Sequence, residues 1–153
     1  MKISKLNVLL AEDSEDDVLM FKRALGRCGI VYTLYVASDG REAIDYLRGE
    51  GKFADRGVYP FPTLLILDIK MPRLSGMDVL QWLHDHEECS VIPTIVLSSS
   101  ALSADIKKAY RLAANAYFTK PNSPEELCDM VKLILSYWKL AHVPDPPQTS
   151  KCS

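Results

Sequence analysis

The stretch TLLILD at residues 63–68 is an apolar run that ends on an acid. Two further runs, at 7–11 and 92–97, are also apolar at nearly every position. A strand that is apolar throughout is buried on both faces, which is typical of a parallel sheet covered by helices. The run at 63–67 therefore predicts a central strand of an α/β sheet.

Mixed apolar runs at 32–36 and 116–119 bring the number of strand candidates to five. Helical patterns alternate with the strands, at about 15–28, 40–48, 76–86, 104–113 and 124–140. A regular alternation of strands and helices over one domain length predicts a doubly wound parallel sheet. A long connection rich in Gly and Pro, at about 49–62, precedes the third strand.

Length and composition exclude several classes of protein. The 153 residues fit one domain with a full core. Because 18 Lys and Arg face 20 Asp and Glu, the net charge of −2 lacks the basic footprint of a nucleic-acid binder. We find neither a membrane-length apolar run nor a signal-peptide core. The four cysteines are too far apart for a zinc site or a compact disulfide framework, so we expect ordinary thiols in a reducing cytoplasm.

Polar side chains follow four of the five predicted strands. Glu12 and Asp13 follow the first strand, and Asp68 follows the third. Three serines, 98–100, end the fourth, and Lys120 follows the fifth. Ligands of open α/β sheets bind at this carboxyl edge. Three carboxylates brought together would repel one another, and a hard divalent cation relieves that repulsion. The pattern predicts a Mg²⁺ site faced by a lysine and a hydroxyl.

Taken singly, these residues also have plainer interpretations. Acids such as Glu12 and Asp13 are favoured at the start of a helix. Asp68 could be a turn residue ahead of Pro72, and Lys120 could be a solvated charge. These readings stay open for each residue alone, whereas four such residues at one edge favour a functional site.

The motifs together resemble the response-regulator receiver family over residues 5–141. The motifs that carry the resemblance are Glu12-Asp13, Asp68-Ile69-Lys70-Met71-Pro72, Gly76, Ser98 and Lys120-Pro121. The resemblance implies a flavodoxin-like fold, an α/β doubly wound five-stranded parallel sheet in the order 2-1-3-4-5. Residues 142–153 lie outside the expected receiver domain and read as a disordered C-terminal tail, so we expect no separate output domain.

The resemblance also implies the chemistry. Asp68 would be the phosphoacceptor, whose carboxylate attacks a phosphohistidine on a partner histidine kinase. Mg²⁺ (or Mn²⁺) would be held by Asp13, Asp68 and the backbone carbonyl of Lys70, and Glu12 would bind it directly or through water. The chain would then be a signalling protein that assists its own phosphorylation and dephosphorylation, rather than an enzyme with a separate substrate.

Three further residues have implied roles on the phosphoryl side. Lys120 and Ser98 would bind the phosphoryl group, and Ser98 would draw the end of the fourth strand inward. Tyr117 matches the aromatic switch of the family, although a tyrosine on a strand also packs well without switching. The Lys120–Pro121 peptide bond is expected to be cis, as in the family.

Lys70 bears on the alternatives to this function. A metal-dependent phosphohydrolase would need an acid at that position, as general acid and base. A flavodoxin-like FMN protein would need phosphate-binding donors where residues 12–17 are acidic. An interaction module that is never phosphorylated would not need the complete set of acids and lysine.

We also expect the Lys70 ammonium to give a comparatively long-lived phosphoform.

The predicted last helix is apolar over two neighbouring arcs. The first covers the core, and the second contains Met130, Leu133, Tyr137 and Leu140. This second arc is either covered by the long connection or the tail, or used for association. We favour a homodimer through the fourth helix, fifth strand and fifth helix, the surface that the family uses for output.

Within the family, the segments 12–14, 46–51, 114–117 and 137–138 resemble the stand-alone regulators of bacterial and cyanobacterial phytochromes. This resemblance implies a bacteriophytochrome, a light-sensing histidine kinase, as the partner, with no nucleic acid and no membrane involved. A receiver that serves a different kinase, or that relays phosphate to another protein, remains the alternative.

Overall fold

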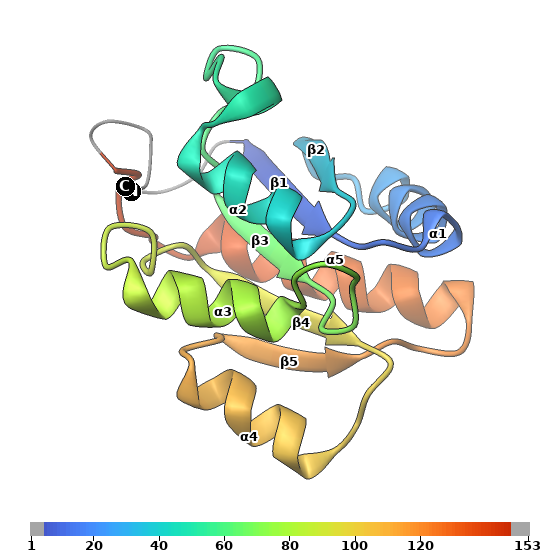
Figure 1. Ribbon diagram of the computed structural model, residues 1–153. Helices are drawn as coiled ribbons and strands as arrows, with labels where there is room; N and C mark the ends of the chain where they lie inside the picture. Colours follow the sequence, from blue (N-terminus) through green and yellow to red (C-terminus); the bar gives the residue numbers. More distant parts are fainter. Residues whose placement is uncertain (1–4, 148–153) are drawn as a thin grey trace.

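Residues 5–147 are described by a computed structural model, in which five parallel strands form one sheet (Figure 1). The strands are β1 (Leu6–Ala11), β2 (Tyr32–Ala37), β3 (Leu64–Leu67), β4 (Thr94–Ser98) and β5 (Ala116–Thr119). They pair in the order β2-β1-β3-β4-β5. This is the 2-1-3-4-5 order of the flavodoxin-like fold, so the prediction of the fold is confirmed.

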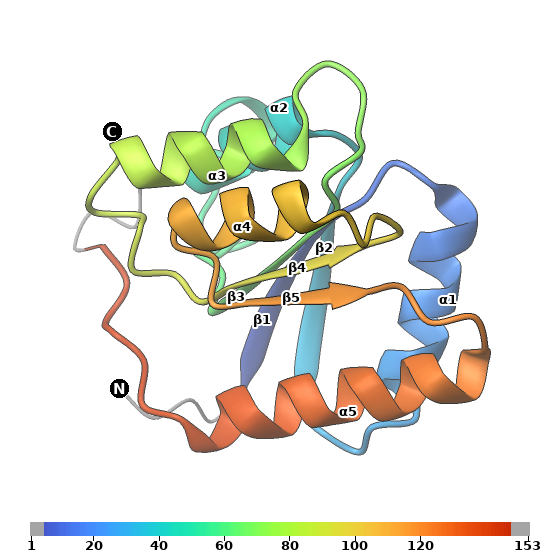
Figure 2. The same ribbon diagram turned by 90° about the horizontal axis from the view of Figure 1, so that it is seen from below.

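Helices cover both faces of the sheet. They are α1 (Glu15–Gly26), α2 (Gly40–Arg48), α3 (Gly76–Asp85), α4 (Ser103–Arg111) and α5 (Pro124–Leu140). Figure 2 shows α1 and α5 on one face and α2, α3 and α4 on the other. None of the helices within residues 5–147 combines the length and hydropathy of a membrane-spanning segment.

The central strands are apolar throughout because alternate side chains face opposite helical layers. Leu9 of β1 and Leu65 of β3 are buried in the cluster under α2, α3 and α4. Their neighbours Leu10 and Ile66 are buried in the cluster under α1 and α5. The edge strands β2 and β5 are instead mostly half-buried. Burial on two faces thus explains the apolar runs.

The connection between α2 and β3 folds around an aromatic cluster. It contains a short 3₁₀ helix, η1 (Gly51–Phe53). The rings of the aromatic cluster have centroids 4.9 to 6.2 Å apart and belong to Tyr35, Tyr46, Phe53 and Tyr59. Offset and edge-to-face contacts at such spacings add to the stability that burial gives.

Side-chain hydrogen bonds to backbone carbonyls fix the aromatic cluster in place. The Arg56 guanidinium donates to the carbonyl oxygens of Leu47 at 2.8 Å and Tyr59 at 3.0 Å. The Tyr46 hydroxyl donates to the carbonyl oxygen of Pro60 at 2.9 Å. Burial raises the pKa of Tyr46 and lowers the pKa of Arg56. The connection is therefore an ordered cap at the amino edge of the sheet.

The segment after α5 differs from the expected disordered tail. Val143 is 5% exposed and packs in the cluster under α1 and α5. Residues 143–146 line a small hollow together with Phe61 and Pro93, at the amino edge of the sheet. A buried apolar side chain one turn beyond a helix can hold such a segment in place. The remainder of the expected tail, 148–153, lies outside the described residues.

The cysteines also differ in part from expectation. Cys28 and Cys128 carry free thiols. Cys89 is fully buried and disulfide-bonded, so the expectation of ordinary thiols does not hold for it.

Candidate functional site

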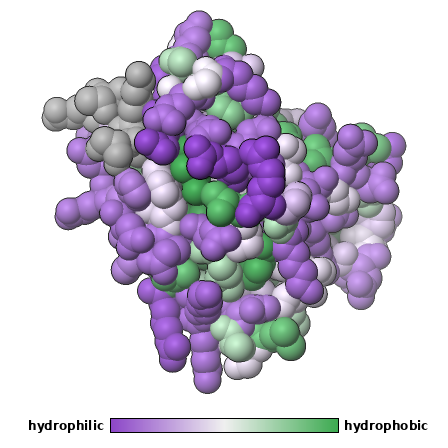
Figure 3. All heavy atoms as spheres, in the orientation of Figure 1, coloured by the Kyte–Doolittle hydropathy of each residue, from purple (hydrophilic) through white to green (hydrophobic). Residues whose placement is uncertain are grey.

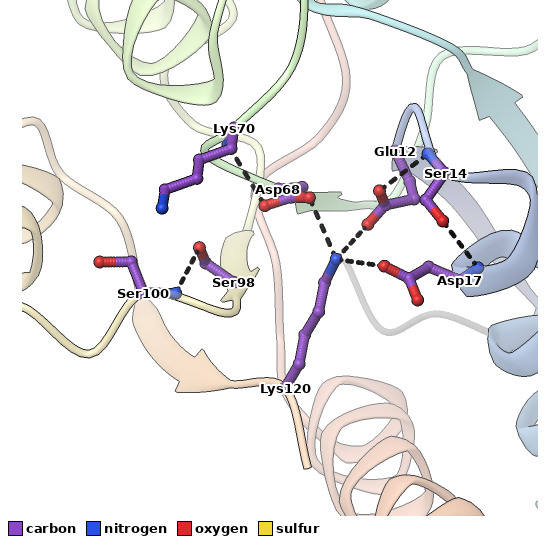
Figure 4. Close-up of polar contacts among 8 residues, drawn as sticks. All are labelled: Glu12, Ser14, Asp17, Asp68, Lys70, Ser98, Ser100 and Lys120. Carbon is purple, nitrogen blue, oxygen red and sulfur yellow. Dashed lines mark hydrogen bonds and ion pairs between the residues drawn. The ribbon is translucent and has the colours of Figure 1, made fainter. Parts of the chain in front are cut away.

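The carboxyl edge of the sheet brings together the residues that follow β1, β3 and β5 (Figure 4). Ala11 pairs with Leu67 in the parallel register, so that Glu12 and Asp68 leave neighbouring strands at the same level. The backbone N–H of Asp68 also donates to the Ala11 carbonyl oxygen at 3.0 Å. Both carboxylates are buried, at 4% and 6% exposure.

Lys120 is the counter-charge at this edge. Its Nζ donates to Glu12 Oε2 at 2.7 Å, to Asp17 Oδ2 at 2.7 Å and to Asp68 Oδ2 at 3.1 Å. The three N–H donors of the ammonium thus meet three carboxylates. Charge-assisted hydrogen bonds of this kind are the strong ones, and here they are partly shielded from water.

Burial and charge shift the pKa values of the two most enclosed groups. Burial raises the pKa of Glu12 from 4.5 to about 7, although the hydrogen bond from Lys120 opposes this shift and the Asp68 charge adds to it. Burial by itself would lower the pKa of Lys120. The hydrogen bonds to Asp17 and Glu12 and the Asp68 charge outweigh it, and the pKa of Lys120 is raised. The lysine is therefore a permanent cation.

The acids at this edge fit a divalent cation. One carboxylate oxygen each from Glu12, Asp13 and Asp68 lies within 4.8 Å of the others. All three are hard oxygen ligands, which Mg²⁺ and Mn²⁺ accept. Asp13 is exposed, so the site opens to solvent on one side. A cation would also favour the ionised form of Glu12, which burial disfavours.

Gly76 allows α3 to begin directly against the phosphoacceptor candidate. A Cβ at this position would lie 2.1 Å from the carbonyl oxygen of Asp68. The backbone N–H of Gly76 donates to the Ile69 carbonyl oxygen at 2.8 Å, closing the loop after β3. A side chain would push this loop away, so a glycine is required here.

Lys70 lies beside Asp68 but apart from Lys120. Its backbone N–H donates to Asp68 Oδ1 at 3.3 Å. The side chain is exposed, and Figure 4 shows its ammonium on the side of Ser98 and Ser100. The two lysines thus flank the Asp68 carboxylate from different sides.

A chain of contacts links Ser98 to Tyr117. Ser98 is fully buried, and its Oγ accepts from the backbone N–H of Ser100 at 3.2 Å. The carbonyl oxygen of Ser100 accepts from the Tyr117 hydroxyl at 2.8 Å. The Ser100 hydroxyl in turn donates to Asp105 on α4. A shift of the Ser98 side chain is therefore passed by Ser100 to Tyr117 on β5 and to Asp105 on α4.

The expectation of a cis Lys120–Pro121 bond is wrong for this structure, in which none of the described peptide bonds is cis. Trans is the lower-energy state of most bonds before proline. Lys120 reaches the carboxylates from a trans bond, with its backbone N–H held by the Ser98 carbonyl oxygen at 2.8 Å.

Sequence reasoning missed Asp17 as a site residue. An acid in the first turn of a helix is expected for capping and for the helix dipole, so the acidic residue type alone did not indicate that Asp17 belongs to the site. Ser100 and Asp105 were missed as links because their contacts depend on the path of the loop after β4.

The second apolar arc of α5 is largely exposed. Leu133 is 64%, Tyr137 63% and Leu140 72% exposed, whereas Met130 is half-buried and packs against the core. The part of the chain that the structure describes thus leaves three of the four predicted contact residues uncovered.

Known proteins share both the sequence pattern and the fold. The response regulator receiver domain matches residues 8–132. The probable methanogenesis regulatory protein FilR2 of Methanothrix harundinacea is 33% identical over 131 residues, 86% of this chain and 82% of FilR2. Response regulator Rcp1 of Synechocystis sp. is 31% identical over 131 residues, 86% of this chain and 87% of Rcp1.

Three solved structures resemble this one over 92% of this chain and 99% of theirs. RPA3017, a response regulator in red light signaling of R. palustris, has a TM-score of 0.86 and 34% identity. The phosphorylated cyanobacterial phytochrome response regulator RcpA has a TM-score of 0.85 and 32% identity. The Mn²⁺-bound form of Rcp1 has a TM-score of 0.82 and 30% identity. With its sheet order and its acidic edge, the chain belongs to the response-regulator receiver family.

Proposed function

We propose that Asp68 accepts a phosphoryl group from a phosphohistidine of a histidine kinase, in a reaction that depends on Mg²⁺ or Mn²⁺. The observation that carries this proposal is the buried Asp68 carboxylate, bound by Lys120 and close enough to Glu12 and Asp13 to share a cation with them. Signal transfer by phosphorylation is general for the receiver family to which the chain belongs.

The transfer is a substitution at phosphorus. An oxygen of the Asp68 carboxylate forms the new P–O bond while the P–N bond to the kinase histidine breaks, and the imidazole leaves with the electron pair. Lys120, already within 3.1 Å of Asp68, neutralises charge on the phosphoryl oxygens. A divalent cation, which Glu12, Asp13 and Asp68 would hold, would supply further positive charge to those oxygens.

Phosphorylation of the isolated chain tests this function. The chain is incubated with Mg²⁺ and a small acyl phosphate, and its mass is followed for the gain of one phosphoryl group. The parent should gain it, whereas Asp68→Ala and the parent in excess chelator should not. Continuous release of phosphate from the donor would instead favour the phosphohydrolase, and no gain by the parent would favour an unphosphorylated module.

The contacts of Ser98 support a route for the signal to leave the site. If the Ser98 hydroxyl turns to a phosphoryl oxygen, its bond from the Ser100 N–H is broken. The Ser100 carbonyl then shifts together with its donor, the Tyr117 hydroxyl. Tyr117 would thereby change its position on β5 in response to phosphorylation.

We further propose a phytochrome kinase as the phosphodonor, because RPA3017, RcpA and Rcp1 resemble the chain over nearly its whole length. FilR2 is as similar in sequence and keeps a different kinase open as the second candidate. Phosphotransfer from a purified bacteriophytochrome kinase, compared with a kinase that lacks a chromophore, distinguishes the two. The cytoplasmic location expected from the sequence stays a prediction.

The face formed by α4, β5 and α5, the α4–β5–α5 face, is our candidate dimer surface. Exposed apolar side chains lie on α5, and a groove of about 340 Å³ runs between β5 and α5, lined in part by Phe118, Leu133 and Tyr137. Tyr110 of α4 is also half exposed, and Figure 3 shows one small hydrophobic group at the lower edge, among mainly hydrophilic spheres. A monomeric mass in light scattering, with and without phosphorylation, would contradict a dimer.

A further inference from the structure

Asp17 contacts the site lysine without belonging to the candidate cation ligands. Its Oδ2 accepts from Lys120 Nζ at 2.7 Å, and its side chain is 45% exposed. The acids that can share a cation are Glu12, Asp13 and Asp68. Figure 4 shows Asp17 reaching Lys120 from α1, on the far side of the ammonium from Asp68.

Lys120 and a cation need the same two carboxylates. Glu12 and Asp68 both bind the ammonium, and both belong to the cation group. A cation that binds them repels the ammonium and takes its acceptors. Among the contacts of Lys120 in the described residues, Asp17 is then the carboxylate that the cation leaves free.

We propose that Asp17 is a positioning residue that holds the Lys120 ammonium on the α1 side of the site, so that Glu12 and Asp68 can bind the cation. The inference rests on the proposed cation-dependent phosphorylation of Asp68. The local structure suits this role, because the backbone N–H of Asp17 donates to Ser14 Oγ at 3.3 Å. The backbone is held by the helix cap while the carboxylate stays free to follow the ammonium.

The expected consequence is a change in affinity for Mg²⁺. In Asp17→Asn the ion pair is lost, so the ammonium depends more on Glu12 and Asp68. Mg²⁺ then has to displace a more firmly bound competitor. For one partly exposed charge-assisted hydrogen bond, we expect binding that is weaker by about three- to tenfold.

Calorimetric titration of the unphosphorylated full chain with Mg²⁺ measures this change. Asp16→Asn is the matched control, because Asp16 lies in the same turn, is exposed and has no contact with Lys120 in the structure. It should change the affinity by less than about twofold. Asp17→Glu retains a carboxylate that can reach Lys120 and should recover most of the loss. A loss in Asp16→Asn as large as in Asp17→Asn would overturn the proposal.

A double-mutant cycle tests whether Asp17 acts through Lys120. In a Lys120→Met background the competitor is gone, so Asp17→Asn should no longer weaken Mg²⁺ binding beyond the small effect of Asp16→Asn. An undiminished loss in that background would refute the positioning role and leave a direct charge effect. If the parent itself bound no Mg²⁺, the proposed cation-dependent function would fail. If the parent bound Mg²⁺ and Asp17→Asn bound it equally well, only the positioning role of Asp17 would fail.

Discussion

The two edges of the sheet are held together by different kinds of contact. At the carboxyl edge, one ammonium forms ion pairs with three carboxylates, at 2.7, 2.7 and 3.1 Å. At the amino edge, the aromatic cluster packs ring against ring, and Arg56 is bound to backbone carbonyls. Contacts between charges can exchange, whereas close packing cannot. One edge is thus built to switch and the other to stay fixed.

The largest expected effect is on the fixed edge. Tyr46→Ala removes a fully buried ring and the hydrogen bond to Pro60, which should lower the free energy of unfolding by about 3–5 kcal/mol. Urea denaturation measures this loss. Tyr46→Phe keeps the ring and should cost only about 1 kcal/mol.

The same variant also tests the separation of the two edges. The folded fraction of Tyr46→Ala should still accept a phosphoryl group from the acyl phosphate at the rate of the parent. A folded but unreactive Tyr46→Ala protein would show that the amino edge contributes to the site.

The second effect is a pH dependence at the switching edge. Without a cation, the pKa of Glu12 is about 7 in the folded chain against an ordinary value of 4.5. The folded state therefore binds more protons between these values, and the free energy of unfolding falls as the pH rises from about 4.5 to 7. The fall is at most roughly 3 kcal/mol.

Urea denaturation at several pH values measures this slope. The Gln side chain of Glu12→Gln cannot ionise, so the free energy of unfolding of this variant should change less over the same pH range. Added Mg²⁺ should stabilise the parent more at pH 7 than at pH 5. Equal slopes for the parent and Glu12→Gln would refute the assignment to Glu12.

The third effect concerns the lifetime of the phosphoform. The backbone N–H of Lys70 donates to Asp68 Oδ1, and from this position its exposed side chain can pair with a phosphoryl group on Asp68 or obstruct an attacking water. Lys70→Asn should lose phosphate about fivefold faster, as expected for one charge-assisted contact of about 1 kcal/mol. Release of radiolabelled phosphate measures the rate. A variant as long-lived as the parent would contradict the prediction.

The smallest effect on stability is expected on the α4–β5–α5 face. Tyr137→Lys places a charge at a 63% exposed position and should change the free energy of unfolding by less than about 0.5 kcal/mol. It should nevertheless convert the proposed dimer to a monomer in light scattering. Gln81→Lys adds the same charge at an exposed position of α3, away from this face, and should leave the mass in light scattering unchanged.

The fold could be predicted from sequence because burial on both faces requires apolar side chains at nearly every position of β1, β3 and β4. The ends of the helices were predicted less accurately. The α1 helix ends at Gly26 rather than near residue 28, and α4 ends at Arg111 rather than near 113. Such ends depend on local capping, which tertiary contacts readily shift.

The centre of the site was also predictable, since the carboxyl ends of parallel strands must meet at one edge. This placed Glu12, Asp68 and Lys120 together. Asp17 was not predictable, because its contact depends on the angle at which α1 leaves the sheet. The trans bond before Pro121 and the buried Val143 were missed, because neither family resemblance nor a proline-rich composition encodes those local packing choices.

The path of residues 141–147 has a practical consequence for anyone who wishes to tag the protein. Because α5 runs back from the site (Figure 2), Val143 lines a hollow with Phe61 and Pro93 at the opposite end of the sheet from Asp68. A fluorophore or affinity tag attached after residue 147 would start from that opposite end. It would leave the acidic edge open to the proposed kinase, and it would report on docking without blocking the approach of that kinase.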